Sequence, residues 1–176
     1  IDNILLIAKI ETGQVELVMK TFNLKDLTER IFDEYDSVAL EKGISFYYEK
    51  GNEYEDILIY SDFDKIKQIL EELLDNAFKF TDSGEVAFGF KKNSDEIQFY
   101  VRDTGTGIQK EEQENVFDNF YQVDGSNTRG YEGTGLGLSI ARALVELVGG
   151  NIWFNSSKQG GTTMFFTIPL SRQIQK

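Results

Sequence analysis

A repeating pattern of hydrophobic and polar residues is clearest from Asp62 to Thr81, where it predicts the central helix of the fold. At about 100° per residue, the apolar residues of this stretch form a core-facing stripe. They are Ile66, Ile69, Leu70, Leu73, Leu74 and Ala77. The polar residues of a second arc are Gln68, Glu72, Asp75, Asn76 and Lys79. A solvated face with i,i+4 ion pairs is one explanation of this polar flank. Because Asn and Asp are poor residues inside a helix, a flank that lines a site for a metal-bound anion is the other.

The remaining pattern predicts further helices and strands in mixed order. Helical spacing occurs at 1–11, 23–42, 111–117 and 137–148, with Asn23 as an N-cap and Gly43 and Gly149 as stops. Alternating or apolar runs predict strands at 14–22, 44–48, 56–60, 85–92, 96–102, 151–155 and 162–170. Two pairs are expected to form hairpins, 85–92 with 96–102 and 151–155 with 162–170. Because β-α-β alternation is not strict, we expect an α+β fold with a layer of helices on a largely antiparallel sheet.

The length of 176 residues allows one well-filled core, and no linker divides 15–170 into two domains. No apolar run approaches the length of a membrane span, and no signal-peptide pattern is present. Because the first residue is not Met, we expect a piece of a longer protein. Residues 1–11 are then either the cut end of a longer helix that paired with a partner, or a small helix docked on its own domain. Periodicity does not separate these two interpretations.

The composition excludes several classes of function. The chain has no cysteine and no histidine, which excludes a disulfide framework, zinc chemistry and Ser-His catalysis. A lack of cysteine also fits a reducing compartment. The formal net charge of −12 argues against nucleic-acid binding, which needs a basic surface. Nucleotides are not excluded, because backbone amides, a few cations and Mg²⁺ can hold them inside an acidic shell.

Gly133, Gly135 and Gly137 stand directly before the helix predicted to start at 137. Without side chains, this backbone can approach an anion closely while the first-turn amides point at it, although an ordinary turn is the alternative. No Gly-Lys-Ser/Thr follows, so this is not a P-loop, and no βαβ unit surrounds it as in a dinucleotide-binding fold.

Asp103, with Gly105 and Gly107, forms a second cluster at the end of a predicted strand. It is either a strand-ending turn or a base pocket. In the second case the carboxylate accepts a hydrogen bond from an exocyclic amine such as N6 of adenine, and the glycines let a flat ring lie against the backbone.

Three further residues suit a metal-bound phosphate chain. Asn76 offers a hard amide oxygen of the kind that Mg²⁺ accepts alongside phosphate and water. Lys79, one turn further along, can contact a phosphate as a point charge. Arg129 lies in a polar segment, 122–132, that we expect to be a mobile loop able to close over the terminal phosphate.

With these residues in view, the chain resembles the catalytic, ATP-binding domain of sensor histidine kinases, within the GHKL ATPase superfamily. Residues 70–81 (LEELLDNAFKFT) resemble the N box and 103–108 (DTGTGI) the G1 box. Residues 117–121 (FDNFY) resemble the F box and 133–139 (GTGLGLS) the G2 box. Residues 160–162 resemble a further glycine element, and 9–13 (KIETG) resemble the junction with the dimerisation helices.

The resemblance implies a Bergerat-type α/β two-layer sandwich, with helices on one face of a mixed, largely antiparallel sheet, that binds ATP and Mg²⁺. Residues 1–13 would be the C-terminal end of a dimerisation helix and its linker, and 14–176 the ATP-binding domain. Asn76 would coordinate Mg²⁺, Lys79 would contact phosphate and Asp103 would bind adenine, with Arg129 in the lid. The nucleotide would also be held by Gly105, Gly107, Ile108, Phe120, Gly133, Thr134, Gly135, Leu136, Gly137 and Leu138.

One position departs from the commonest kinase pattern, since Glu72 stands where many of these kinases have Asn. Glu-x-x-x-Asn is the arrangement of the superfamily's hydrolytic branch, in which the glutamate activates water. Glu72 is therefore either a general base or a residue that supports the metal shell. Three functions follow as hypotheses: a histidine kinase domain, an ATP hydrolase and a nucleotide-binding docking module.

The resemblance also implies partners. They are the parent's own dimerisation domain, which must carry the histidine that this chain lacks, and the receiver domain of a response regulator. The parent would be a homodimer, with or without a membrane anchor. We expect this part of it to be cytoplasmic, without contact to membrane or nucleic acid.

Overall fold

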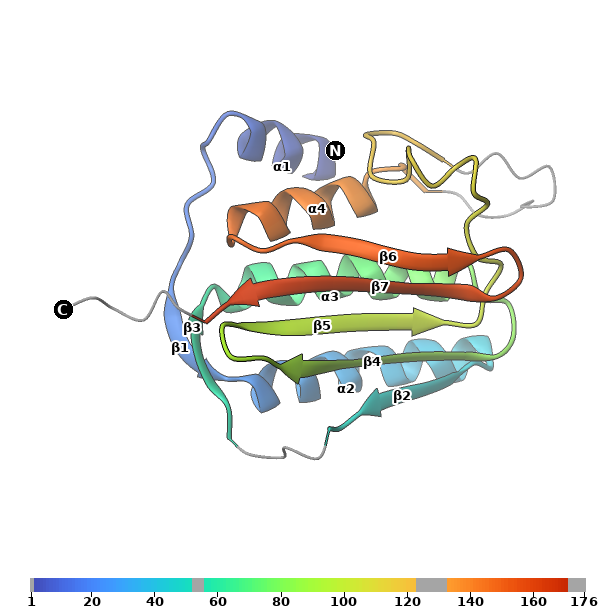
Figure 1. Cartoon of the computed structure of the whole chain (residues 1–176), viewed down its shortest axis with the longest axis horizontal. Coiled ribbons are helices and arrows are strands. Elements are labelled where there is room, and N and C mark those ends of the chain that lie inside the picture. The colour runs from blue at the N-terminus through green and yellow to red at the C-terminus, as the bar shows by residue number, and fades with distance from the viewer. Residues whose placement is uncertain (1, 52–55, 123–132, 171–176) are drawn as a thin grey trace.

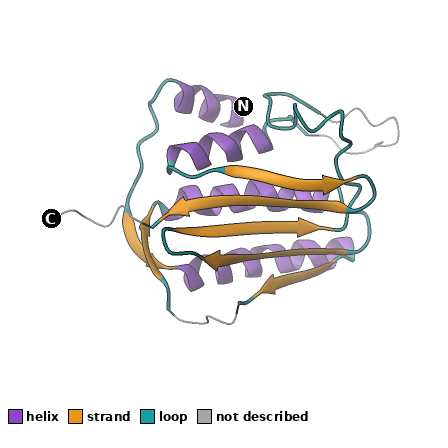
Figure 2. Cartoon of the chain, in the orientation of Figure 1, coloured by secondary structure: helices purple, strands orange, loops and turns teal. Residues whose placement is uncertain are grey.

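The computed structural model describes residues 2–51, 56–122 and 133–170, and places them in two layers (Figure 1; Figure 2). The helices within these ranges are α1 (Asp2–Glu11), α2 (Leu24–Lys42), α3 (Phe63–Lys79) and α4 (Gly137–Leu147). The strands are β1 (Lys20–Asn23), β2 (Ser45–Glu49), β3 (Leu58–Ser61), β4 (Glu85–Lys92), β5 (Glu96–Asp103), β6 (Ile152–Ser157) and β7 (Gly161–Pro169). In Figure 1 the helices α2 and α3 lie behind the main sheet, α4 is seen above β6, and α1 lies beyond α4. The predicted α+β sandwich is confirmed.

The main sheet has the spatial order β2-β4-β5-β7-β6, and β1 and β3 form a separate antiparallel ribbon. In the main sheet β2 pairs with β4 in parallel, and the other pairs are antiparallel. Both predicted hairpins are present as β4–β5 and β6–β7. The strands expected at 44–48 and 56–60 are also present, but as β2 and β3 they belong to different sheets.

Two predicted elements are wrong in detail. The strand expected at 14–22 pairs only from Lys20 onward, and in the segment before it the Val18 amide donates instead to Asp62 Oδ2 at 2.8 Å. The helix expected at 111–117 is a series of turns with i→i+3 hydrogen bonds, such as Asn115 N to Glu112 O at 3.1 Å. Its apolar residues, Val116 and Phe117, stand only at its end, so the segment has no apolar stripe to bury along a helix.

The core lies between the helices and the sheet. Every residue of the predicted α3 stripe is at most 2% exposed. Phe99 of β5 and Phe166 of β7 meet this layer from the sheet, stacked with ring centroids 4.8 Å apart. Each such buried side chain contributes roughly 1.5–3 kcal/mol relative to an exposed one. Asp62, itself 2% exposed, begins α3 by accepting the Lys65 amide at 3.0 Å. These contacts anchor α3 along its whole length.

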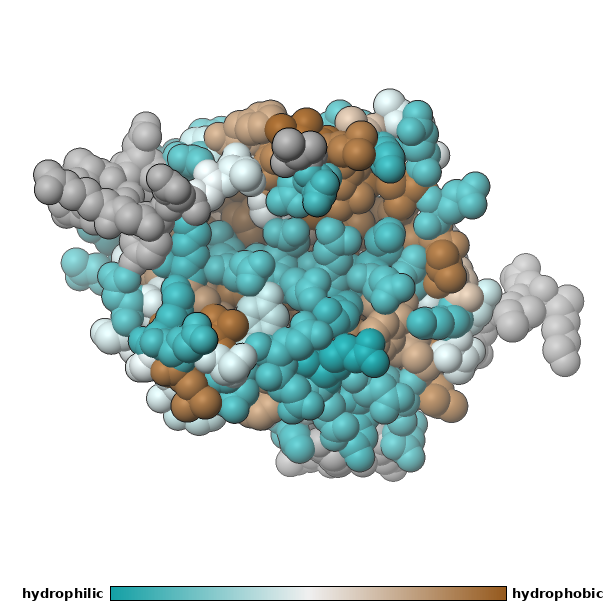
Figure 3. Space-filling view, turned by 180° about the vertical axis from the view of Figure 1, so that it is seen from behind, coloured by the Kyte–Doolittle hydropathy of each residue, from teal (hydrophilic) through white to brown (hydrophobic). Residues whose placement is uncertain are grey.

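Helix α1 packs on α4 through one side. Its Ile7 is 8% exposed, whereas Ile4 and Leu5 are 53% and 52% exposed. Figure 3 shows the molecule from behind, with hydrophobic side chains gathered over α1 at the top, above a largely hydrophilic surface. Here α1 is docked on its own domain, and its origin as the end of a dimerisation helix stays a prediction. Within the described ranges, no helix has the length and apolar character needed to cross a bilayer.

Candidate functional site

Four element ends meet at one end of the sandwich. There α3 and β5 finish at Lys79 and Asp103, while β7 and α4 begin at Gly161 and Gly137. Because β5 and β7 are antiparallel, Asp103 stands directly opposite Thr162. Residues far apart in the sequence are therefore brought around one hollow.

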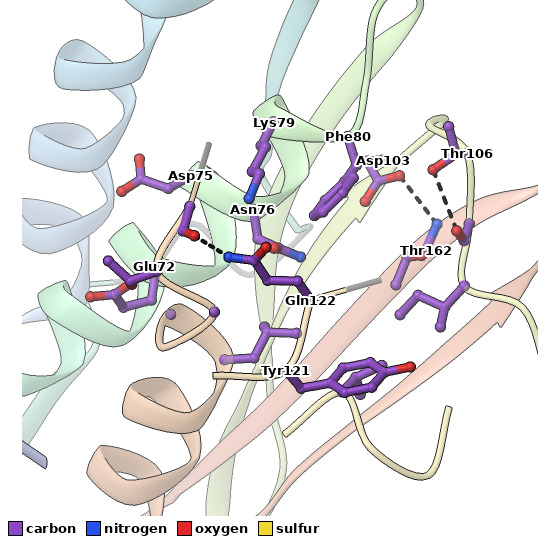
Figure 4. Close-up of a pocket in the computed structure, with 18 of the residues that line it drawn as sticks. Glu72, Asp75, Asn76, Lys79, Phe80, Asp103, Thr106, Tyr121, Gln122 and Thr162 are labelled. Atoms are coloured by element: carbon purple, nitrogen blue, oxygen red, sulfur yellow. Dashed lines mark hydrogen bonds between the residues drawn. The ribbon is translucent and has the colours of Figure 1, made fainter. Parts of the chain in front are cut away.

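This hollow is a pocket with a polar end on α3 and a more enclosed end on the sheet. Figure 4 shows Glu72 and Asp75 at one end, Asp103 and Thr162 at the other, and Asn76 and Lys79 between them. The described residues that line it are Asn3, Glu72, Asp75, Asn76, Lys79, Phe80, Asp103, Thr106, Gly107, Ile108, Val116, Tyr121, Gln122, Gly133, Thr134, Gly135, Gly137, Leu138 and Thr162.

Asp103 defines the enclosed end. Its side chain is buried, and Oδ1 accepts the amides of Gly105 at 2.9 Å and Thr162 at 3.3 Å. Burial raises the pKa of this carboxyl, and the two amide hydrogen bonds act in the opposite direction. Among the described residues, none donates a hydrogen bond to the second oxygen, Oδ2. An acceptor is thus left for a donor on a ligand.

The turn after Asp103 requires glycine at two positions. A Cβ on Gly105 would collide with the Phe80 carbonyl, and one on Gly107 would collide with the Ser157 carbonyl. Gly107 also has a φ of +69°, which favours glycine. The backbone therefore lies flat against α3 on one side and the β6–β7 turn on the other, as a wall for a planar group.

The polar end of the pocket collects groups from α3. Burial, with smaller effects from Asp75 and Glu71, raises the pKa of Glu72 to about 7. Asp75 is held from α2, because the Tyr35 hydroxyl donates to its Oδ1 at 2.7 Å. The Lys79 ammonium lies over the Phe80 ring, 5.1 Å from its centroid. The Glu72 carboxyl and the Lys79 ammonium line the same pocket from one helix, and such a set suits a ligand that carries both phosphate and a divalent cation.

The turn before α4 closes the pocket. Gly135 has a φ of +68°, and a Cβ there would lie 2.8 Å from the Tyr121 carbonyl. A Cβ on Gly137 would lie 3.1 Å from Glu72 Oε2. Leu136 is the N-cap residue of α4, and no side chain of the described residues caps this helix start. The first-turn amides are therefore left to bind an anion.

The donor set fits a magnesium ion only together with phosphate oxygens. Across the described ranges, no group of three or more His, Cys, Asp and Glu side chains is placed to hold a metal ion. Asn76 lines the pocket with Glu72 and Asp75 on the same helix. Mg²⁺ characteristically takes one or two protein oxygens and completes its shell with phosphate and water, so these residues are compatible with it.

Most of the predicted site residues line this pocket. They are Glu72, Asn76, Lys79, Asp103, Gly107, Ile108, Gly133, Thr134, Gly135, Gly137 and Leu138. Gly105, Phe120 and Leu136 do not line it: Gly105 lies against Phe80, Phe120 is 61% exposed, and Leu136 is 1% exposed in the core. Arg129 lies outside the described residues.

Sequence reasoning missed some lining residues that stand beside predicted ones. Phe80 and Thr106 are immediate neighbours of predicted residues. The sequence did not indicate that their side chains point into the pocket. Thr162 was noted only as part of a glycine element, and its place opposite Asp103 depends on strand register. Asn3 enters from α1, which no local pattern near the boxes could indicate.

The chain is similar to known proteins along most of its length. The family profile described as "Histidine kinase-, DNA gyrase B-, and HSP90-like ATPase" matches residues 61–172. The sensor histidine kinase WalK of Bacillus subtilis is 43% identical over 121 residues, which cover 67% of this chain and 20% of WalK. The hybrid signal transduction protein dokA of Dictyostelium discoideum is 37% identical over 180 residues, which cover 97% of this chain and 11% of dokA. The chain thus spans about a fifth or less of the length of these relatives.

Solved structures of histidine kinases have a similar fold. Full-length ShkA in complex with AMPPNP superimposes with a TM-score of 0.84 at 27% identity, covering 96% of this chain and 34% of ShkA. The histidine kinase ThkA, in complex with the response regulator protein TrrA, has a TM-score of 0.74 at 26% identity, covering 95% of this chain and 47% of ThkA. By profile, relatives and fold, this chain belongs to the histidine kinase-, DNA gyrase B- and HSP90-like ATPase family, as a catalytic domain of the sensor histidine kinase type.

Proposed function

We propose that this chain binds ATP with Mg²⁺ and passes the γ-phosphoryl group to a histidine outside this sequence. The observation that carries the proposal is that Asn76, Asp103 and Gly135, from three separate segments, line one pocket. The similar structure of ShkA holds AMPPNP, an ATP analogue, which supports the same ligand here. Because the chain has no histidine, the acceptor must lie on another part of the parent protein.

At the enclosed end, the proposed ligand group is adenine. Asp103 Oδ2 would accept from its exocyclic amine while Oδ1 stays bound to the Gly105 and Thr162 amides. The ring would lie along the Gly105–Ile108 turn, with the buried Ile108 side chain against it. These contacts orient the base and exclude water from it.

At the polar end, the proposed ligand group is the triphosphate. Lys79 and the first-turn amides of α4 would hold its oxygens, and Asn76 would hold Mg²⁺ with the support of Glu72. When bound, Mg²⁺ would offset the negative charge of the phosphates. The reaction breaks the bond from the γ-phosphorus to the β–γ bridging oxygen, which leaves with ADP, and forms a bond from the γ-phosphorus to an imidazole nitrogen of the acceptor. Phosphoryl transfer needs mainly positioning and charge stabilisation, so no covalent intermediate on this chain is required. We assign Arg129 to closure over the γ-phosphate.

The proposed partners follow from the same reaction. Residues 1–13 would continue into the parent's dimerisation domain, which supplies the acceptor histidine within a homodimer. A receiver domain of a response regulator would then take the phosphoryl group, as the complex of ThkA with TrrA suggests for a similar kinase.

Two measurements test this proposal. In the first, the melting temperature of the chain should rise with AMPPNP, and rise further with Mg²⁺, because a ligand of the folded state stabilises it by mass action. In the second, the full-length parent with radiolabelled ATP should form an acid-labile phosphohistidine. Asn76→Ala should abolish the label without unfolding the protein. A parent that binds ATP and folds but never labels a histidine contradicts the proposal.

One observation favours a second candidate, an ATP hydrolase. A Glu72 pKa of about 7 suits a general base that activates water near neutral pH. Steady phosphate release from the wild-type chain, lost in Glu72→Gln while AMPPNP still binds, would support hydrolysis. Negligible release from the wild-type chain would reject it.

A further inference from the structure

Ser156 of β6 lies outside the residues assigned above, yet its hydroxyl contacts both walls of the proposed base pocket. It accepts the Ile108 amide at 2.7 Å and donates to the Gly161 carbonyl at 3.1 Å. It also lies 2.8 Å from the Thr162 hydroxyl, with either oxygen able to donate. One side chain therefore joins the turn after β5 to the first residues of β7.

The sheet register makes this contact possible. Asp103, Thr162 and Ser156 stand directly opposite one another on β5, β7 and β6. Directly opposite residues project on the same side of a sheet, so their side chains can interact in a row. The row ends at the turn that carries Ile108.

The contacts close into a ring of hydrogen bonds at the enclosed end of the pocket. Asp103 Oδ1 accepts the Thr162 amide at 3.3 Å, and the Thr162 hydroxyl meets Ser156. Ser156 holds the Ile108 amide, and the turn returns to Asp103 through the Gly105 amide at 2.9 Å. Ile108 is tied on its other side too, because Gln113 Nε2 donates to its carbonyl at 3.1 Å.

The segment from Gly105 to Ile108 has no helix or strand of its own. Its position depends on contacts such as Thr106 N to Phe80 O at 3.2 Å and Gln159 N to Thr106 O at 3.0 Å. Within the described residues, the Ser156 hydroxyl is the partner of the Ile108 amide. Without it, a partly buried N–H loses its hydrogen bond, and the wall of the pocket loses its tie to β6.

We propose that Ser156 is a positioning residue for nucleotide binding, which sets the Gly105–Ile108 turn and Asp103 at the right separation for the base. This inference rests on the proposed ATP-binding function. Ser156 does not line the pocket, so it acts through Ile108 and Thr162. Substitution of Ser156 should therefore weaken the contacts to the base and leave those to the phosphates unchanged.

The test compares Ser156→Ala with a control on the same strand. Ser157 is exposed and has no hydrogen bond from its side chain to any described residue, so Ser157→Ala is matched in size and location. By calorimetry, the Kd for ADP and for AMPPNP should rise about tenfold in Ser156→Ala, the effect of one partly buried amide left unpaired. The factor should be the same with and without Mg²⁺. Ser157→Ala should bind as the wild type does, and Ser156→Thr, which keeps the hydroxyl, should recover most of the affinity.

Amide hydrogen exchange gives an independent readout. The Ile108 amide should exchange faster in Ser156→Ala, while the Val101 amide in the middle of β5 keeps its protection. Equal nucleotide affinity in Ser156→Ala and wild type overturns the inference, as does a loss that merely follows global unfolding. If the wild-type chain binds no nucleotide, it is the proposed function that fails. In that case, unchanged exchange of the Ile108 amide in Ser156→Ala would show that Ser156 does not hold the Gly105–Ile108 turn.

Discussion

The Nζ atom of Lys79, at the end of α3, occupies the space that a Cβ on Gly133 would fill. The lysine of one predicted box and the first glycine of another therefore share one corner of the pocket. Because the ammonium is the far end of a flexible side chain, we expect a substitution in this corner to affect ligand binding more than stability.

Gly133→Ala should displace the Lys79 ammonium from this corner. We expect the Kd for ATP to rise about fivefold, since one charged contact to phosphate is weakened, while the melting temperature hardly changes. Calorimetry with AMPPNP and with adenosine separates the effects, because adenosine lacks the phosphates. Equal losses for both ligands would show that Lys79 does not act on phosphate.

Gly135→Ala should behave differently although it is only two residues away. Its φ of +68° and the backbone of Phe120 and Tyr121 leave no room for a side chain. We expect a loss of about 1–3 kcal/mol in the free energy of unfolding, measured by urea denaturation. If Gly135→Ala is as stable as Gly133→Ala, the turn has another backbone geometry in solution.

Asp103→Asn should change which base is bound. The amide oxygen can still accept from the Gly105 and Thr162 N–H groups, so the fold should persist. The amide nitrogen then stands where Oδ2 stood and donates instead of accepting. We expect the affinity for ATP to fall about 30-fold, the effect of one hydrogen bond to a charged group, and the preference for ATP over GTP to shrink. Unchanged ATP affinity would place adenine elsewhere.

The carboxyl of Glu72 should make stability depend on pH. It loses its proton near pH 4.5 in the unfolded chain and near pH 7 in the folded chain. The folded state binds this proton more tightly, so this group lowers the free energy of unfolding as pH rises between these values. Without nucleotide, Glu72→Gln should therefore melt at a higher temperature than wild type at about pH 8, with the difference vanishing toward pH 4.5. The exposed Glu41→Gln is the control, and a pH-independent difference for Glu72→Gln would contradict the assignment.

Ile7→Ala should release α1 from α4. Its side chain is 8% exposed, and loss of such a contact typically costs about 2 kcal/mol or more. Hydrogen exchange in α1 should then accelerate while α3 stays protected. Ile4→Ala, on the exposed side of the same helix, should leave exchange unchanged. Unaltered protection of α1 in Ile7→Ala would mean that α1 does not dock on this domain in solution.

Local signals account for what sequence reasoning predicted well. The α3 stripe follows from helical periodicity, and the ends of α2 follow from Asn23, whose side chain accepts the Lys25 amide, and from Gly43, with a φ of +68°. Reasoning failed where the signal was not local. Residues 111–117 contain helix-forming glutamates but form turns, because the segment has no apolar stripe to bury. Phe120 belongs to a predicted box, yet its side chain is 61% exposed and its φ is +62°, which the local residue pattern did not indicate.

By itself, the sequence determined the helices, most of the strands and the residue types of the site, since periodicity, capping and glycine requirements act within a few residues. The tertiary structure decided which of these residues meet. Thr162 reaches Asp103 across 59 positions only because β7 pairs with β5 in one register, and a shift of one residue would turn Thr162 to the other face of the sheet. Ser156 enters the same row through β6. Strand register is set by the packing of the whole core, so no short motif could have specified it.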